Sequence, residues 1–253
     1  MINSIIKATD ILHILSSNPE KTFSLSELSN LSSLNKSTCS HILETLCATF
    51  YVERVSRKEG YRLGPWAYML SRKSRYQESL IQTSKSVIQW LHEQLNVTVF
   101  LDVMCNGKKF ILYYIDDDRL ILNSGDSILQ GVMETSCSGL LHMAYMGNEQ
   151  LREVIKTNSE EKEISAISAK INSLQWTFDN IRKNKYSYFY NKELQHHSYA
   201  FPIQDHSRVI AALGIVYTAD RNSERFAEQV IANGLEAGRE ISRRIKFEQS
   251  YGK

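Results

Sequence analysis

The sequence lacks the segments that would place it in or across a membrane. No run of apolar residues approaches the roughly 20 that a transmembrane helix needs, and Met1–Lys7 does not have the charged, apolar and cleavage regions of a signal peptide. The four cysteines are scattered and form no CxxC pair, which favours reduced thiols over disulfides. These absences predict a cytoplasmic protein that has no membrane partner.

The sequence also lacks the short motifs of several enzyme classes. It contains no glycine-rich phosphate-binding loop and no HExxH helix. A catalytic pair of Cys137 with His142, or a zinc site built from Cys137, His196, His197 and His206, stays open as an alternative, although nothing in the spacing fixes the distances between these residues. We predict no enzyme activity, no cofactor and no metal site.

The sequence has little net charge, but its charged residues are unevenly distributed. The net charge of the 253 residues is only +2, which alone does not indicate a nucleic-acid-binding protein. Residues 1–75 hold ten Lys or Arg and six Asp or Glu, an excess of +4, whereas the remaining residues hold twenty and twenty-two, a balance of −2. Because one domain usually takes roughly 100–200 residues, we expect two domains, the first of them mildly basic.

Two short helices with a tight connection are predicted between residues 24 and 50. Ser24 and Glu27 have the spacing of a capping box, in which each side chain bonds to the backbone amide of the other residue, and Asn35 is a good N-cap for the next helix. The apolar side of that second helix consists of Cys39, Ile42, Leu43, Leu46 and Phe50. Its opposite side consists of the small or polar residues Ser37, Ser40, His41, Glu44 and Ala48.

A basic hairpin follows the helix pair. Alternation from Tyr51 to Val55 predicts a strand, Arg57–Gly60 predicts a turn, and Tyr61–Leu63 predicts the returning strand. Basic residues on an edge strand can serve only to prevent aggregation, but together with the helix pair they favour a winged helix-turn-helix. Such a unit places its second helix in the major groove of DNA with the wing beside it, and small polar residues allow close approach to base edges.

Five blocks of the first 64 residues match the IclR family of bacterial transcription regulators in order and spacing. They are Ser4–Leu12, Leu25–Leu28, Lys36–Thr38, Ile42–Leu46 and Tyr61–Gly64. The chain therefore resembles this family, and the resemblance implies a recognition helix and a wing that contact operator DNA. The residues expected to contact DNA are Lys7, Ser26, Lys36, Ser37, Thr38, Ser40, His41, Arg54, Arg57, Lys58 and Arg62.

This part of the chain departs from the family pattern at three positions. Lys7 and His41 stand where the family usually has Arg, and Phe50 replaces a frequent Gly at the end of the recognition helix. A neutral imidazole cannot replace a forked guanidinium, so any contact at His41 must differ from the one that arginine makes.

From residue 76 onward, helical and strand patterns alternate. A helical stripe covers Leu80–Leu95, and strands are predicted at Val97–Val103, Phe110–Ile115 and Leu120–Leu122. Further helices follow, and two more strands are predicted at Tyr199–Ile203 and Val209–Tyr217. An antiparallel sheet with helices is an α+β arrangement of the kind found in sensor domains.

This second half resembles the effector-binding domain of the IclR family, whose fold is GAF-like. The matching blocks are Thr135–Gly139, Tyr199–Ile203 and Ala211–Ile215. The resemblance implies a winged helix-turn-helix domain at 1–70, a linker helix at 71–80 and an effector-binding and oligomerisation domain at 81–253. It also implies that a small organic acid binds at a helix N-terminus, which suits a carboxylate. The residues expected to line this site are Cys137, Ser138, Gly139, Tyr188, Ser198, Gly214 and Val216.

The expected pocket differs from the family pattern. Gly214 and Val216 stand where acid-binding members often have hydroxyls, and Leu140 replaces a frequent Lys. We therefore expect a roomier or more apolar pocket and a larger or partly aromatic effector, with Tyr188 and Tyr199 as walls. Cys137 is expected near a helix start, which lowers the pKa of a thiol.

Together these patterns predict a transcription regulator controlled by a small acidic or aromatic effector. Its expected partners are a double-stranded DNA operator and further copies of the chain, in a homodimer or tetramer, and the resemblance favours a repressor. Two alternatives stay open: a winged-helix sensor or adaptor that acts through protein contacts, and a small-molecule enzyme that depends on Cys137.

Overall fold

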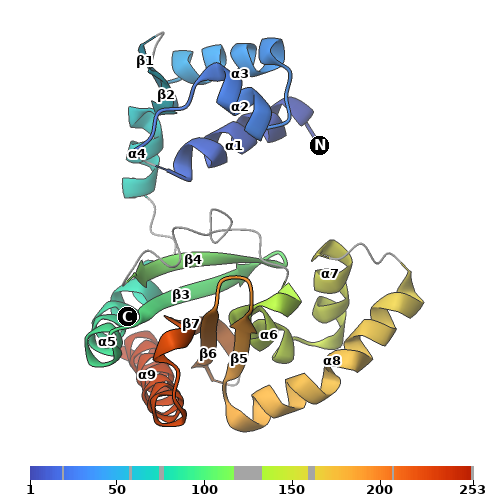
Figure 1. The fold of residues 1–253 in the computed structure, drawn as a ribbon, viewed down its shortest axis with the longest axis vertical. Coiled ribbons are helices and arrows are strands. Elements are labelled where there is room, and N and C mark those ends of the chain that lie inside the picture. The colour runs from blue at the N-terminus through green and yellow to red at the C-terminus, as the bar shows by residue number, and fades with distance from the viewer. Residues whose placement is uncertain are drawn as a thin grey trace. The chain divides into compact units, whose positions relative to one another are not determined.

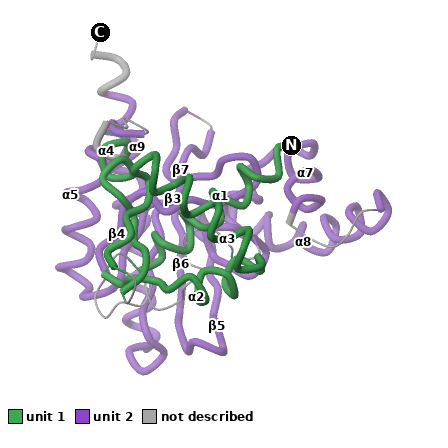
Figure 2. The backbone as a smooth tube through the Cα atoms, turned by 90° about the horizontal axis from the view of Figure 1, so that it is seen from above, with its two compact units in different colours: residues 1–76 green, residues 77–253 purple. Residues whose placement is uncertain are grey.

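The structure is a computed structural model that describes residues 1–18, 20–56, 59–73, 77–116, 133–158, 163–206 and 208–251. The chain divides into two compact units, residues 1–76 and residues 77–253, which Figure 2 colours separately. Each unit has its own hydrophobic core. None of the described helices is long and apolar enough to cross a membrane.

The N-terminal unit consists of short helices and one hairpin (Figure 1). Its elements are α1 (Asn3–Ser16), α2 (Leu25–Leu31), α3 (Lys36–Ala48), β1 (Val52–Ser56), β2 (Gly60–Leu63) and α4 (Pro65–Lys73). β1 and β2 pair antiparallel, and Gly60 has φ +95°, a conformation that the turn between them requires of glycine. The buried core residues are Ile11, Leu15, Phe23, Leu28, Cys39, Leu43, Leu46, Val52 and Tyr61. The predicted winged helix-turn-helix is therefore confirmed.

Side-chain caps set the first residue of α2 and of α3, as the sequence predicts. The Glu27 amide donates to Ser24 Oγ (3.2 Å), and the Ser24 amide donates to the Glu27 carboxylate (2.8 Å). The Thr38 amide donates to the Asn35 side-chain oxygen at 2.8 Å. These bonds satisfy amides that the first turn of a helix otherwise leaves without partners, so each helix start is specified by its own side chain.

The end of α3 differs from the prediction. Phe50, expected on the apolar side of the helix, is 66% exposed and has φ +61°. It occupies the left-handed position that ends many helices and that glycine usually fills, and a bulky residue rarely adopts this conformation. The backbone turn after α3, rather than burial, therefore decides where this ring lies.

The C-terminal unit contains a five-stranded antiparallel sheet in the order β4-β3-β7-β6-β5. The strands are β3 (Thr98–Cys105), β4 (Lys108–Ile115), β5 (Ser187–Asn191), β6 (His196–Asp205) and β7 (Arg208–Thr218). The helices are α5 (Glu78–Leu95), α6 (Cys137–Ala144), α7 (Asn148–Asn158), α8 (Ile164–Asn184) and α9 (Glu224–Tyr251). The strand predicted at 120–122 lies outside the described residues. The predicted α+β class is confirmed.

Helices cover both faces of this sheet (Figure 1). One face packs against α5 and α9, and the other packs against α6, which α7 and α8 cover in turn. Because side chains alternate along a strand, Tyr199 and Phe201 face α5 and α9, whereas Ala200 faces α6. The side of the sheet on which a residue lies therefore decides which core or site it can join.

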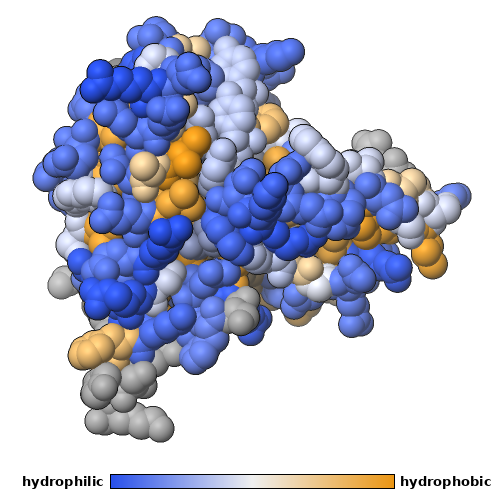
Figure 3. Space-filling model, turned by 90° about the horizontal axis from the view of Figure 1, so that it is seen from below, coloured by the Kyte–Doolittle hydropathy of each residue, from blue (hydrophilic) through white to orange (hydrophobic). Residues whose placement is uncertain are grey.

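A groove of about 880 Å³ runs along the outer side of α5 and α9. Val87, Trp90 and Leu235 supply apolar lining, and Arg239 and Arg243 border it. Figure 3 shows one face of the molecule, on which apolar surface lies between hydrophilic borders. Apolar surface of this kind on the outside of a folded unit is typical of an interaction site.

Candidate DNA-binding surface and ligand site

The face of α3 that points away from the core is short and polar. Lys36, Ser37 and His41 are exposed, and Thr38 and Ser40 are half-buried. The opposite face of the helix is buried in the core of the N-terminal unit. The structure therefore leaves all five predicted recognition-helix residues at least partly exposed on α3, and Ser37, Ser40 and His41 make the side of the helix away from the core small and polar.

One acidic residue, Glu44, lies on the same face. Its carboxylate accepts a hydrogen bond from Ser40 Oγ (3.2 Å) and lies 3.7 Å from His41 Nδ1. A carboxylate repels phosphates, but in the major groove it can accept a hydrogen bond from the amino group of cytosine. The sequence pattern places Glu44 on this face without indicating a contact; its position beside Ser40 and His41 marks it as a candidate base-reading residue.

The wing presents two arginines in different surroundings. Arg62 Nε lies 2.9 Å from the Glu53 carboxylate directly across the hairpin. Arg54 lies over the ring of Tyr61, 5.5 Å from its centroid, and has no carboxylate partner among the described residues. Arg54 is therefore the freer of the two for a phosphate contact.

The other predicted DNA contacts are dispersed. Lys7 is half-buried on α1, and Ser26 is exposed in the first turn of α2. Arg57 and Lys58, expected at the tip of the wing, lie outside the described residues.

In the C-terminal unit, the predicted ligand residues gather at the start of α6. Ser136 caps this helix by accepting a hydrogen bond from the Gly139 amide at 3.2 Å, and all eight residues of the helix are buried. A Cβ atom at Gly139 would clash with the Met133 carbonyl oxygen. Close packing against the preceding turn therefore accounts for glycine at this position.

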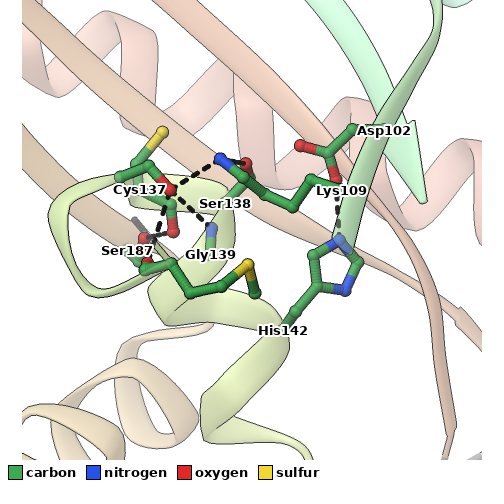
Figure 4. Close-up of polar contacts among 9 residues, drawn as sticks. Asp102, Lys109, Cys137, Ser138, Gly139, His142 and Ser187 are labelled. Atoms are coloured by element: carbon green, nitrogen blue, oxygen red, sulfur yellow. Dashed lines mark hydrogen bonds and ion pairs between the residues drawn. The ribbon is translucent and has the colours of Figure 1, made fainter. Parts of the chain in front are cut away.

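A lysine from β4 reaches the same loop, as Figure 4 shows. Lys109 Nζ donates to Ser136 Oγ at 2.7 Å and to Ser138 Oγ at 3.5 Å. Within the described ranges, no carboxylate lies at ion-pair distance from Lys109. A helix N-terminus carries partial positive charge, so this ammonium group adds to a positive potential rather than neutralising it. The loop is thereby suited to an anion.

Sequence reasoning did not identify Lys109, because 27 positions separate it from Ser136. The only available signal was the absence of a lysine at Leu140, next to the loop. The fold supplies the missing positive charge from a neighbouring strand.

Three predicted ligand residues of the sheet lie on the face that α6 covers. Ser198 and Val216 are directly paired between β6 and β7, and Gly214 is paired with Phe100 of β3. The Phe100 ring occupies the space into which a side chain at Gly214 would project, and Phe100 is 7% exposed. Of the two expectations for this pocket, roomier or more apolar, Gly214 does not provide the first, because the apolar ring of Phe100 fills the space beside it.

Tyr188 and Tyr199 lie on the opposite face of the sheet. Tyr199 packs in the core beneath α5 and α9, and its ring centroid is 4.9 Å from that of Tyr188. The Tyr188 hydroxyl bonds to His197 Nδ1 at 2.9 Å, whereas the preceding residue, Ser187, donates to the Cys137 carbonyl from the α6 side. The structure therefore does not bring these two tyrosines to the ligand site as walls.

Cys137 also differs from the expectation. Burial raises the pKa of its thiol to about 12, against the smaller lowering effect of Lys109. A thiol that is protonated at neutral pH is a poor nucleophile. His196 and His197 point to opposite faces of β6, and the described part of the chain contains no group of three or more His, Cys, Asp or Glu that could hold a metal. The thiol-enzyme and zinc alternatives therefore gain no support.

A buried polar pair lies beside the Lys109 loop (Figure 4). His142 Nε2 is 2.7 Å from Asp102 Oδ1, and the two side chains are only 5% and 2% exposed. His142 follows Ser138 by about one turn of α6. A buried pair of this kind is costly unless it is well hydrogen-bonded, and periodicity did not predict it because its partners are 40 residues apart.

A winged helix-turn-helix and a separate α+β unit with an anion-suited loop define a class of two-domain DNA-binding regulators. Residues 4–56 match the model of the IclR helix-turn-helix domain. No curated protein matches the chain in sequence. Residues 4–56 are therefore a helix-turn-helix domain of the IclR type.

Solved structures of IclR proteins extend the likeness to nearly the whole chain. A putative IclR transcriptional regulator from Silicibacter sp. TM1040 is 22% identical, with 96% of each chain covered and a TM-score of 0.65. An IclR homologue from Microbacterium hydrocarbonoxydans, complexed with 4-hydroxybenzoate, is 17% identical over 95% of this chain and 99% of that chain, with a TM-score of 0.68. IclR of Thermotoga maritima is 17% identical over 97% and 100%, with a TM-score of 0.60. The predicted resemblance to the IclR family is confirmed, and the chain has the IclR fold.

Proposed function

We propose that this protein is a ligand-responsive transcription regulator that binds operator DNA as a homo-oligomer and acts as a repressor. The polar face of α3 reads base edges, and Arg54, with the rest of the wing, contacts phosphates. A dimer would present two α3 helices to half-sites about one helical turn apart, or a multiple of it. The apolar groove along α5 and α9 is a surface on which copies of the chain could associate.

The observation that carries ligand control is the position of Lys109. Its ammonium group is held by Ser136 and Ser138 at the positive end of α6 and has no carboxylate partner among the described residues. A small carboxylic acid would supply the missing negative charge and could also accept hydrogen bonds from the two serines. The 4-hydroxybenzoate complex of the Microbacterium homologue supports aromatic acids as the first compounds to test.

Ligand and DNA binding must be linked in both directions. If an acid lowers the affinity of the protein for its operator, bound operator lowers the affinity for the acid by the same factor. Measuring both affinities therefore tests regulation more strictly than measuring either one.

DNA binding is tested by fluorescence anisotropy with a duplex from the protein's own promoter over a range of salt concentrations. We expect Arg54→Ala to weaken binding and to reduce the slope of log K against log salt by about 1, as the loss of one phosphate contact does. Arg62→Ala is the matched control: it should have a smaller effect, because Arg62 already pairs with Glu53. Failure of the wild-type protein to bind at low salt would favour the adaptor alternative, in which the winged helix contacts proteins.

Ligand binding is tested by calorimetry with benzoate, 4-hydroxybenzoate and pyruvate. We expect Lys109→Met to reduce acid binding at least tenfold, whereas Lys108→Met should leave it unchanged, because Lys108 is the exposed neighbour on the same strand. Equal binding by the wild type and Lys109→Met would contradict the anion site.

A further inference from the structure

A second candidate site lies in a cleft of the C-terminal unit, on the side of His142 away from the Lys109 loop. Its volume is about 840 Å³, which lies within the range of small-molecule sites. Its walls come from the β3–β4 turn, the second half of α6, α7 and the start of β7. Neither Lys109 nor the start of α6 lines it, so it is separate from the proposed anion site.

The cleft has a mixed lining, in which five apolar side chains stand among polar residues such as Gln77, Asn106, Gln150 and Thr157. Met104, Met146, Val154, Val209 and Ile210 line it, and these side chains suit the body of an aromatic or branched aliphatic molecule. The charged lining residues, Glu153 and Arg208, are both exposed and of opposite sign. The charges of these two lining residues therefore cancel.

Two polar atoms at this cleft have no hydrogen-bond partner among the described residues, and one of them is itself buried. One is Nδ1 of His142: the ring bonds to Asp102 through Nε2 only, and His142 lines the cleft while being 5% exposed. The other is the Tyr145 hydroxyl, whose oxygen is buried without a partner, and Tyr145 also lines the cleft. Buried polar groups are nearly always hydrogen-bonded, so the Tyr145 hydroxyl leaves a hydrogen bond that a ligand in the cleft could complete.

Asp102 determines what His142 offers to that partner. A carboxylate only accepts hydrogen bonds, so Nε2 must carry a proton. In an uncharged ring the second nitrogen, Nδ1, then presents a lone pair. Figure 4 shows Nδ1 on the side of the ring away from Asp102. A ligand group that meets Nδ1 must therefore donate a hydrogen bond.

We propose that this cleft binds a small uncharged molecule with an apolar body and a hydroxyl group, which donates to His142 Nδ1. The Tyr145 hydroxyl, which can both donate and accept, provides a second polar contact. Asp102 acts as a positioning residue, because it holds the imidazole in the tautomer that accepts.

Phenol and anisole are matched probes, because they share one ring and differ in the hydrogen that can be donated. The full-length protein, labelled with ¹⁵N in its histidines, is titrated with each probe and followed by NMR. We expect phenol to shift the His142 Nδ1 resonance and to bind at least tenfold more tightly than anisole. Equal affinities, or no shift at His142 with either probe, would overturn the proposal.

Substitutions at His142 test whether phenol binds in this cleft. His142→Phe removes the acceptor but leaves the Asp102 carboxylate buried without a partner, so the double variant Asp102→Asn, His142→Phe keeps the test valid if the single variant fails to fold. We expect phenol binding to fall at least tenfold in both. His206→Phe, the same change at an exposed histidine of the β6–β7 turn, should not alter it. Unchanged phenol binding in the double variant would place the probe elsewhere and refute the proposal.

Lys109→Met separates this proposal from the anion site. It should weaken benzoate binding at least tenfold without changing the affinity for phenol. If Lys109→Met weakened phenol binding as much as benzoate binding, the cleft would not be an independent site.

Discussion

Helices α3 and α6 begin in the same way and end up in opposite environments. Each starts with a polar N-cap whose side chain accepts a hydrogen bond from the amide three residues later, Asn35 from Thr38 and Ser136 from Gly139. α3 keeps one face exposed, whereas α6 is buried on every side. Capping chemistry thus specifies where a helix starts, but the surrounding elements decide whether its polar groups face the surface or the interior.

The largest contrast between the two units should appear when polar pairs are broken. His142→Phe leaves the Asp102 carboxylate buried without its partner, and a buried charge without its partner typically costs about 3–5 kcal/mol. Glu53→Ala removes the exposed partner of Arg62, which is worth about 0–1 kcal/mol. Hydrogen exchange at amides of each unit would measure both effects. Equal losses would show that burial does not distinguish the pairs.

A smaller effect is expected at Gly214. An added methyl group in Gly214→Ala must displace the Phe100 ring, and overpacking of this kind costs about 1–3 kcal/mol. Gly147→Ala is the matched control, because nothing lies within 4 Å of a Cβ atom at that position. Denaturant unfolding would compare the two variants, and a neutral Gly214→Ala would show that Phe100 can move aside.

The two caps themselves provide the next test. Loss of a side-chain N-cap costs about 0.5–2 kcal/mol, so Asn35→Ala and Ser136→Ala should destabilise their units by similar amounts. Ser136→Ala should in addition weaken acid binding, because it removes an acceptor that positions Lys109. Unfolding and benzoate titration would be measured on both variants. An unchanged benzoate affinity in Ser136→Ala would restrict this serine to helix capping.

The smallest expected effect is a loss of stability of the N-terminal unit at acid pH. Hydrogen bonding from the Ser24 amide, together with Lys21, lowers the pKa of Glu27 from 4.5 to about 2. A lowered folded-state pKa means that the capping box contributes fully above pH 4.5 and loses its contribution as the pH falls through about 2. NMR titration of the Glu27 carboxyl should give the low value, and Ser24→Ala should raise it. A midpoint near 4.5 would indicate that the capping box does not persist in solution.

The N-terminal unit was largely predictable because its determinants are local. The Ser24 and Glu27 capping box and the Asn35 cap act over three residues, and the polar face of α3 follows from helical periodicity. Phe50 was misplaced because periodicity does not reveal a left-handed residue at a helix end.

The C-terminal site was less predictable because its contacts are distant in sequence. The small-residue loop at Ser138 and Gly139 was identified, but Lys109 and the pairing of His142 with Asp102 depend on strand order. Tyr188 was assigned to the wrong side of the sheet because a one-residue change of position on a strand exchanges its faces.

The burial of α6 on every side has a mechanical consequence. Apart from the cleft beside His142, the close-packed surroundings leave no free volume in which the helix could shift alone, so α6 should move together with the strands and helices against which it packs. A ligand that bound Lys109, which contacts the start of α6, or His142, which lies further along the helix, would therefore act on the same helix. A displacement at one end of the helix would then reach the other end directly, without successive movements of the side chains between them.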